Sequence, residues 1–483
     1  MPWSELSPRH DAGSPAARRS RAVIRIALLT ALGQLSAALL LLTACASPPA
    51  APIAAAAGAQ PAPAILPAVE PTLAPERTLV PEPTPTPERT LVPEPTDAPP
   101  TVSPLPRYDL VLVGATLLDA TGAPPLPNAA VAIRGSHIVD IGPAGALRYS
   151  ADTPVRDVSG ATLLPGFINA HVHITGLTDD DLRRWTRAGI TTVRDLAGPT
   201  AERVAARERI RRADDPTLPR LLVAGPIVTV ADGYPLAVGD RTLRVEGVAV
   251  QGAEHARTII SALADAGVDQ IKIAVSGRSD VDWQELTDDE IAAITGAAHA
   301  RGLRVSAHAD RAAALERVVR GGIDDAAHSP RDRVPDEVFA MMAARGVTMT
   351  PTIAVYEALA RHRGKDAAWR QQTQPVMYDN LRRFVAAGGI LALGDDYGGV
   401  PDMPVGMPMA ELLHWQAAGL SPQQIIEAST RGSAIAAGID AELGTVEVGK
   451  VADLLVVQGD PLADLSALAR PLLVIREGKI VTP

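Results

Sequence analysis

An apolar run that ends in two histidines constrains the fold of this chain more than any other segment. Residues 165–173 read Pro-Gly-Phe-Ile-Asn-Ala-His-Val-His. Side chains alternate between the two faces of a strand, so His171 and His173 are expected on one face at the end of a strand. Two imidazoles that converge from one strand supply half of a divalent-metal site. A single His-x-His pair is a weak signal, so its meaning depends on the other strands.

Four later apolar runs each carry a polar residue that can bind a metal. Lys272 interrupts one run, His308 and His328 each end a run, and Asp396 ends the last. An unpaired buried ammonium is very costly, so Lys272 must form an ion pair, shift its pKa or be chemically modified. Asp395 competes with Asp396, but adjacent strand residues face opposite ways. Only one of the two aspartates can therefore face the histidines.

Apolar strand patterns alternate with helical patterns through the middle of the chain. The expected strands cover residues 163–173, 191–196, 221–223, 270–274, 303–308, 324–328, 347–353 and 390–396, with helices near 179–188, 201–213 and 254–266. This alternation predicts an α/β fold, a parallel (β/α)8 TIM barrel. The candidate metal residues fall at or near the carboxyl ends of these strands, which is the face where barrel enzymes place their chemistry.

Short strand patterns flank this alternating region on both sides. They cover residues 108–113, 130–133 and 137–141 before it, and 451–457, 472–476 and 479–481 after it. They predict a small β-sandwich domain formed from both ends of the folded region. The expected domains are therefore a sandwich part at 107–164, a barrel at 165–440 and a second sandwich part at 441–483.

The first residues resemble an export signal. A basic stretch with Arg18, Arg19, Arg21 and Arg25 precedes an apolar segment at 27–42 that is too short for a comfortable membrane span, which predicts a signal peptide at 1–44. The following Leu-Thr-Ala-Cys45 resembles a bacterial lipobox. Lipid on Cys45 would anchor the exported protein to the outer face of the bacterial cytoplasmic membrane or the cell surface.

Two alternatives for this leader stay open. One is an ordinary export signal in which Cys45 is incidental, and the other is twin-arginine export through Arg18 and Arg19. Since Cys45 is the only cysteine, the chain cannot form an internal disulfide framework.

Residues 45–106 are rich in Pro, Ala and Thr, and the segment Pro-Glu-Arg-Thr-Leu-Val-Pro-Glu-Pro-Thr occurs at 75–84 and again at 87–96. Such a segment buries too little apolar surface to offset its ordering entropy, so we expect a disordered linker. Its prolines suit a spacer between a membrane and a folded domain.

The metal-binding residue types, in this order, resemble the metal centre of the amidohydrolase superfamily, and the resemblance covers residues 107–483. Further matching segments are Thr191-Thr-Val-Arg-Asp195, Gly449-Lys-Val-Ala-Asp-Leu454 and Gly459-Asp-Pro-Leu462. The combination is most similar to the branch that holds imidazolonepropionase-like enzymes and metal-dependent Xaa-Pro or Xaa-Arg dipeptidases.

The chain departs from that branch at three places. Ala327-His328-Ser329 stands where Glu-His-Gly is usual, and Asp310 follows the strand-five histidine where an aromatic or polar side chain is common. Gly394-Asp395-Asp396 stands where Gly-Thr-Asp is usual. The metal residues survive these changes, but substrate specificity does not transfer with them.

The resemblance implies one or two divalent ions, with zinc as the expected ion. The implied ligands are His171, His173, Lys272, His308, His328 and Asp396. In this family the lysine is carboxylated by CO2 and bridges two metals, whereas a neutral or ion-paired lysine beside one metal is the alternative. Asp396 and His328 are the implied catalytic residues. Arg194 and Asp195 either contact substrate or form a structural ion pair.

The implied activity is that of a metal-dependent amidohydrolase, in which a metal-activated hydroxide hydrolyses the C–N bond of an amide, peptide or cyclic amide. Dipeptides and N-acyl amino acids are candidate substrates. Two alternatives are a catalytically inactive, surface-anchored binding lipoprotein and a barrel isomerase or decarboxylase that shares the metal centre.

The expected partners are a small amide or peptide substrate and a membrane, through the lipid on Cys45. A homo-oligomer is compatible with the sequence. The net charge of −10 and the lack of a basic face argue against a nucleic-acid partner.

Overall fold

Three sheets organise the part of the chain that the computed structural model describes, residues 105–238, 246–276, 284–400 and 403–481. The expected signal peptide, most of the expected linker and Cys45 lie outside the described residues. Within the described ranges, no helix combines the length and apolar character that crossing a bilayer requires.

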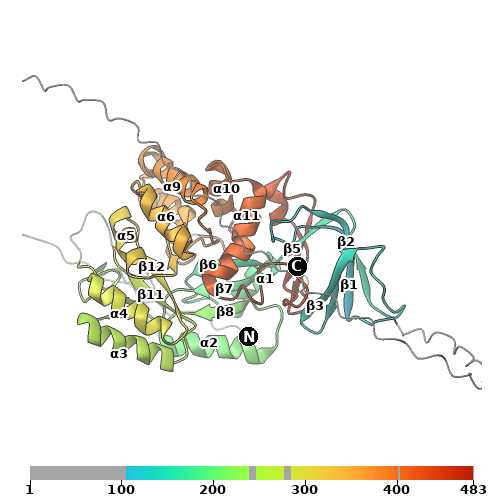
Figure 1. The fold of residues 1–483 in the computed structure, drawn as a ribbon, viewed down its shortest axis with the longest axis horizontal. Coiled ribbons are helices and arrows are strands. Elements are labelled where there is room, and N and C mark those ends of the chain that lie inside the picture. Colours follow the sequence, from blue (N-terminus) through green and yellow to red (C-terminus); the bar gives the residue numbers. More distant parts are fainter. Residues whose placement is uncertain (1–104, 239–245, 277–283, 401–402, 482–483) are drawn as a thin grey trace, which may run out of the picture. The chain divides into compact units, whose positions relative to one another are not determined.

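Strands from both ends of the described chain share one mixed sheet (Figure 1). Its order is β17-β16-β15-β5-β1-β2-β3, with β4 beside β1. The strands are β1 (Leu110–Leu117), β2 (Leu126–Arg134), β3 (His137–Pro143), β4 (Val155–Asp157), β5 (Ala161–Pro165), β15 (Leu454–Gln458), β16 (Pro471–Arg476) and β17 (Lys479–Val481). The antiparallel β5–β15 ladder joins the two ends. Because these eight strands form one sheet, the two-layer sandwich stays a prediction.

Parallel strands form the other two sheets. One holds β6 (Phe167–Val172), β7 (Ile190–Asp195) and β8 (Arg220–Val223). The other has the order β10-β9-β11-β12-β13-β14 and consists of β9 (Ile227–Thr229), β10 (Gly247–Ala249), β11 (Gln270–Ala274), β12 (Arg304–His308), β13 (Asp325–Ala326) and β14 (Thr348–Met349). The mixed α/β content agrees with the prediction, whereas one continuous eight-stranded barrel sheet is not observed among the described strands.

One predicted strand is divided in the structure, and another is absent. The run 163–173 is divided at Gly166, so that β5 enters the mixed sheet and β6 the parallel one. Gly166 packs closely against Thr191, where a side chain would collide. The strand predicted at 390–396 is wrong, because this segment makes only isolated bridges. Asp396 there adopts a left-handed backbone conformation (φ 55°), which a regular strand does not allow.

Helices follow most of the parallel strands. They are α1 (Asp179–Arg187), α2 (Thr200–Ala213), α3 (Gly252–Asp265), α4 (Asp288–His299), α5 (Ala312–Arg320), α6 (Asp336–Arg345), α7 (Ile353–His362), α8 (Asp366–Ala368), α9 (Gln374–Ala386), α10 (Met409–Ala417), α11 (Pro422–Glu427) and α12 (Ser433–Ala437). The expected cap of the first helix is present, since Thr178 and Asp181 form a capping box. Helices α2 to α6 lie around the outside of the parallel strands (Figure 1).

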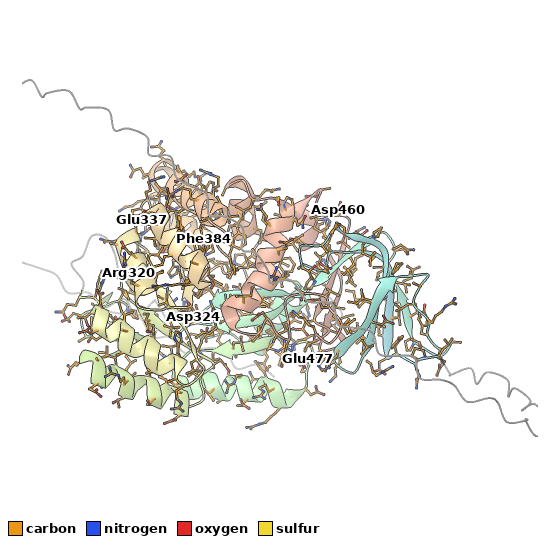
Figure 2. All side chains as sticks on the ribbon, in the orientation of Figure 1. Arg320, Asp324, Glu337, Phe384, Asp460 and Glu477 are labelled. Atoms are coloured by element: carbon orange, nitrogen blue, oxygen red, sulfur yellow. The ribbon has the colours of Figure 1, made fainter. Side chains whose placement is uncertain are left out.

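The helices bury an apolar face and expose a charged one. Phe384 of α9 is fully buried and packs on Phe339 of α6, with ring centroids 5.5 Å apart. Arg320 and Glu337, at the surface of α5 and α6, are exposed (Figure 2). This division is what a helix covering a sheet requires.

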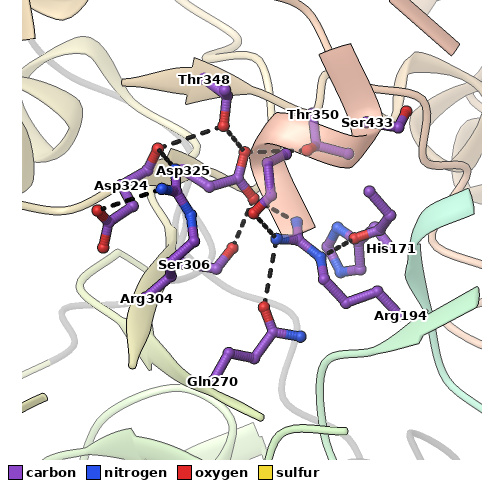
Figure 3. Close-up of polar contacts among 12 residues, drawn as sticks. His171, Arg194, Gln270, Arg304, Ser306, Asp324, Asp325, Thr348, Thr350 and Ser433 are labelled. Atoms are coloured by element: carbon purple, nitrogen blue, oxygen red, sulfur yellow. Dashed lines mark hydrogen bonds and ion pairs between the residues drawn. The ribbon is translucent and has the colours of Figure 1, made fainter. Parts of the chain in front are cut away.

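A buried ion pair connects the two parallel sheets. Arg194 of β7 and Asp325 of β13 approach to 2.5 Å, and each side chain is 1% exposed. Neighbouring strands and α12 satisfy their remaining polar atoms (Figure 3): Ala170, Gln270 and Ala436 accept from Arg194, while Ser306, Thr348 and Thr350 donate to Asp325. A buried pair is tolerated only when its geometry and its extra hydrogen bonds are this complete.

We expect Asp325→Ala to lower the free energy of unfolding by about 3–5 kcal/mol, because it leaves the Arg194 guanidinium buried without its counter-charge. Urea unfolding of the purified protein measures this. The control is Arg209→Ala, which breaks an exposed pair with Asp179 (side chains 51% and 38% exposed) and should cost about 1 kcal/mol or less. Equal losses in the two variants would show that the buried pair does not stabilise the fold.

Candidate metal centre

Two histidines at the end of β6 face one aspartate. Asp396 Oδ1 lies 3.2 Å from His171 Nε2 and 2.9 Å from His173 Nε2. Both histidines are buried. One potential ligand atom from each of these three residues lies within 4.8 Å of the others, so the group could hold a metal ion. The strand end that carries the His-x-His pair therefore faces Asp396.

The backbone around residue 395 sends the two neighbouring aspartates in different directions. Asp395 accepts a hydrogen bond from the side chain of Asn169 at 2.8 Å. Asp396 has a left-handed backbone conformation, and its N–H donates to the carbonyl of His171 at 3.0 Å. This main-chain bond fixes Asp396 beside the histidines, so the structure separates the roles that the two residues can have.

The other predicted ligands adjoin this group. The ring of His328 lies 4.9 Å from that of His171 and 4.4 Å from that of His308 (centroid distances). Lys272 of β11 is 2% exposed. Its positive charge acts on both His171 and His308 and lowers the pKa of each, after the larger effect of burial. The structure thus brings the four predicted histidines and Asp396 together, and Lys272 is close enough for its charge to act on two of these histidines.

Burial keeps His171, His308 and His328 neutral. It lowers the pKa of His308 to about 4 and holds the pKa values of His171 and His328 well below their usual range. Burial also lowers the pKa of Lys272 to about 7, against the opposing attraction of Asp396. Neutral imidazoles are the form that ligates a metal.

Unsatisfied buried atoms in this cluster fit a bound cation. Within the described chain, Lys272 Nζ and Asp396 Oδ1 are buried and make no hydrogen bond of normal geometry, although Asp396 Oδ1 lies 2.9 Å from His173 Nε2. Buried polar atoms are otherwise almost always paired. Imidazole nitrogen and carboxylate oxygen form the ligand set of zinc sites in hydrolytic enzymes. The residues present therefore fit a divalent ion.

Thr352, which contacts His328, and Glu411, which accepts a hydrogen bond from the first turn of α7, escaped the sequence reasoning. Thr352 Oγ1 lies 2.7 Å from His328 Nδ1, which leaves Nε2 as the other ring nitrogen. Thr352 makes no capping hydrogen bond to α7, and Glu411 of α10 accepts instead from the Ala354 N–H at 2.7 Å. Glu411 also accepts from Trp415 Nε1 at 2.8 Å. The sequence offers one sign of the role of Glu411, which is that this carboxylate lies among the apolar residues of α10.

Arg194 and Asp195 each form an ion pair, but not with one another. Arg194 pairs with Asp325, as described above, and Asp195 Oδ2 lies 2.5 Å from Arg203 Nε. We expected these residues either to contact substrate or to form a structural ion pair. The structure shows ion pairs, each with a partner from elsewhere in the chain.

Two tyrosines border the cluster. Tyr234 stacks on His308 with ring centroids 4.6 Å apart, and Tyr356 meets His328 edge-on at 5.9 Å.

Comparisons with known proteins agree with this geometry. The amidohydrolase family profile matches residues 162–481. An imidazolonepropionase of Symbiobacterium thermophilum is 25% identical over 389 residues, which cover 72% of this chain and 91% of the relative. This relative and the family profile both extend over most of the described residues.

Solved structures show the same fold. A Xaa-Pro dipeptidase with bound methionine superposes with a TM-score of 0.68 at 23% identity, covering 77% of this chain and 100% of the other. A protein of Bifidobacterium longum, provisionally described as a prolidase, gives a TM-score of 0.67 at 28% identity and covers 78% and 95%. These neighbours have a TIM-barrel type of fold.

We expect the carboxylate of Glu411 to make the fold less stable as the pH rises. Burial raises its pKa from 4.5 to about 7, so the unfolded chain releases this proton first. The contribution of Glu411 to the free energy of unfolding should fall across that interval by about 3 kcal/mol. Urea unfolding of wild type and Glu411→Gln, on either side of the interval, measures it.

Relative to Glu411→Gln, the wild type should lose stability at the higher pH. Glu337→Gln, which replaces an exposed carboxylate of α6, is the control. A stability difference between wild type and Glu411→Gln that does not change with pH would contradict the prediction.

Proposed function

The chain belongs to the amidohydrolase family, and from that premise we propose that it is a metal-dependent hydrolase that cleaves the C–N bond of an amide, peptide or cyclic amide. The observation that carries the proposal is the convergence of His171, His173 and Asp396, with ligand atoms within 4.8 Å of one another. Similarity to an imidazolonepropionase and to a Xaa-Pro dipeptidase supports a substrate of this class.

We also infer that the parallel strands close into a barrel. Single parallel bridges join Ala224 to Gln270, Met349 to Leu391 and Val172 to Tyr397. These bridges lie where the two parallel sheets meet and where the 390–397 segment passes between β14 and β6. They support a ring of strands in chain order, with the metal residues at its carboxyl end.

One or two divalent ions, for which we propose zinc, would be held by the four histidines, Asp396 and Lys272. When bound, the ion supplies Lewis acidity that lowers the pKa of water and polarises the substrate carbonyl. In this proposal Asp396 accepts the proton of the attacking water and delivers it to the leaving nitrogen. This gives one carboxylate the successive roles of base and acid.

The hydrogen bond to Thr352 decides what His328 can do. If Nδ1 carries the proton, Nε2 is free to ligate a metal. If Thr352 donates, Nε2 carries the proton and stabilises the oxyanion that develops on the carbonyl. Both roles use the ring orientation that Thr352 fixes.

We propose that Lys272 is carboxylated. Its Nζ is buried and has no hydrogen-bond partner in the described chain, so an ammonium there would be very costly. Addition of CO2 to the neutral amine forms a carbamate and releases a proton. The carbamate would supply an anionic ligand if two ions are bound, whereas a neutral Lys272 beside one ion is the alternative.

We further propose that the protein is exported and anchored by lipid on Cys45. The support is the basic stretch, the apolar segment and the Leu-Thr-Ala-Cys45 motif of the sequence. Residues 45–106 would then serve as the spacer between the membrane and the hydrolase domain.

We expect the purified protein, grown with zinc and bicarbonate, to contain nearly two metal ions per chain. Lys272→Ala should reduce this towards one or none, because it removes the bridging carbamate. Asp396→Asn should retain metal but reduce turnover of a dipeptide panel by about 10²–10⁴-fold. Metal content by mass spectrometry and product analysis measure both.

Each part of the proposal can fail separately. One metal ion that Lys272→Ala does not affect would remove the carbamate and keep the enzyme. Full turnover in Asp396→Asn would remove the proton-transfer role. No metal and no turnover in wild type would favour the surface-anchored binding protein instead.

We expect Cys45→Ala to abolish membrane anchoring without changing the hydrolase domain. In a bacterial host, wild type should partition into the detergent phase of a phase-separating detergent, and the variant into the aqueous phase. The mass of the wild-type N-terminal peptide should include acyl chains. An unmodified Cys45 in the processed protein would contradict the lipid anchor.

A further inference from the structure

A fixed arginine lies beside the metal cluster. Arg331 Nη2 pairs with Asp310 Oδ2 at 2.5 Å, and the Arg331 N–H donates to the Asp310 carbonyl at 3.0 Å. Two hydrogen bonds to Ser276 hold Asp310 in turn. Asp310 Oδ1 accepts from Ser276 Oγ at 2.8 Å, and the Asp310 N–H donates to Ser276 Oγ at 2.9 Å. The Asp310 carboxylate therefore has a fixed orientation, and it fixes the position of the Arg331 guanidinium.

Arg331 keeps donors that this contact does not use. Its Nε is buried and has no hydrogen-bond partner among the described residues. Its side chain is nevertheless 30% exposed, whereas that of Asp310 is 6% exposed. A guanidinium has five N–H donors in a planar fork that matches a carboxylate. Arg331 can thus hold a second anion while it stays paired with Asp310.

Tyr356 connects this arginine with the metal cluster. Arg331 Cζ lies 5.9 Å from the centroid of the Tyr356 ring, and the ring of His328 lies 5.9 Å from that same centroid. The guanidinium therefore stands one aromatic ring away from the ligands. The two ring contacts limit the distance from Arg331 Cζ to the His328 ring to at most about 12 Å. A carboxylate bound to the guanidinium and a carbonyl held at the ligands would each take up about 4 Å of this distance, which leaves about the length of one extended residue.

We propose that Arg331 is the subsite for a free carboxylate of the substrate, adjacent to the scissile bond. This proposal rests on the hydrolase function proposed above and narrows its substrates to those with an acidic group on the leaving side, as in a dipeptide or an N-acyl amino acid. Asp310 acts as a positioning residue that orients the guanidinium. Substrates without that carboxylate lose the contact.

The test uses a panel of dipeptides and their C-terminal amides, which differ only in the charge of that group. Wild type should favour the acids in kcat/KM by roughly 10- to 100-fold, as expected for a charge-assisted hydrogen bond. Arg331→Met should remove most of this preference, because it should lower kcat/KM for the acids far more than for the amides. Arg333→Met is the control, because Arg333 pairs with Asp379 and its side chain is 65% exposed.

A second readout separates binding from hydrolysis. The thermal midpoint of the Asp396→Asn variant, with and without Arg331→Met, is measured in the presence of each acid and each amide. We expect the acids alone to raise the midpoint, and only when Arg331 is present.

The outcomes are distinct. Equal hydrolysis of acids and amides would overturn the carboxylate subsite and keep the hydrolase. No hydrolysis, together with an Arg331-dependent stabilisation by the acids, would support the subsite and overturn the proposed function for these substrates. Neither hydrolysis nor stabilisation would overturn both. Equal loss on acids and amides in Arg331→Met would assign Arg331 a structural role instead.

Discussion

The buried ion pair between Arg194 and Asp325 holds together the strands that carry the metal residues. Three of its hydrogen-bond partners lie just before metal residues in the sequence: Ala170 is one residue before His171, while Gln270 and Ser306 are two residues before Lys272 and His308. Alternate residues of a strand share one face, so Gln270 and Ser306 form a layer directly below the ligands. Loss of the ion pair would therefore shift the strands that carry Lys272 and His308, and with them the positions of these ligands.

The sequence predicts the chemistry of the site better than the form of the strands that carry it. The His-x-His pair and Asp396 do converge, and the run at 270–274 has the bounds of β11. Alternation of apolar residues, however, cannot tell which sheet a residue joins, so the division at Gly166 went unnoticed. The strand prediction for 390–396 was wrong for a local reason. The segment has the apolar pattern of a strand, but Asp396 adopts a left-handed backbone conformation.

Contacts between distant segments lie beyond such patterns altogether. Glu411 stabilises the start of α7, which lies 57 residues earlier, and nothing near Glu411 in the sequence reveals this partner. The Asp310–Arg331 pair, 21 residues apart, is similar. Asp310 was recognised only as a departure from the family pattern. In the structure Asp310 pairs with Arg331. Members of one fold diverge in function through loops of this kind.

The ladder between β5 and β15 has a consequence for how the chain is made. A hydrogen bond between Thr162 and Gly459 at this ladder closes a loop of 297 residues. Such distant pairing forms slowly, because the entropy of closing the loop is lost before any contact is gained. Until the last strands emerge from the ribosome, one edge of β5 stays unpaired and open to other chains. The protein is therefore most exposed to aggregation during its own synthesis.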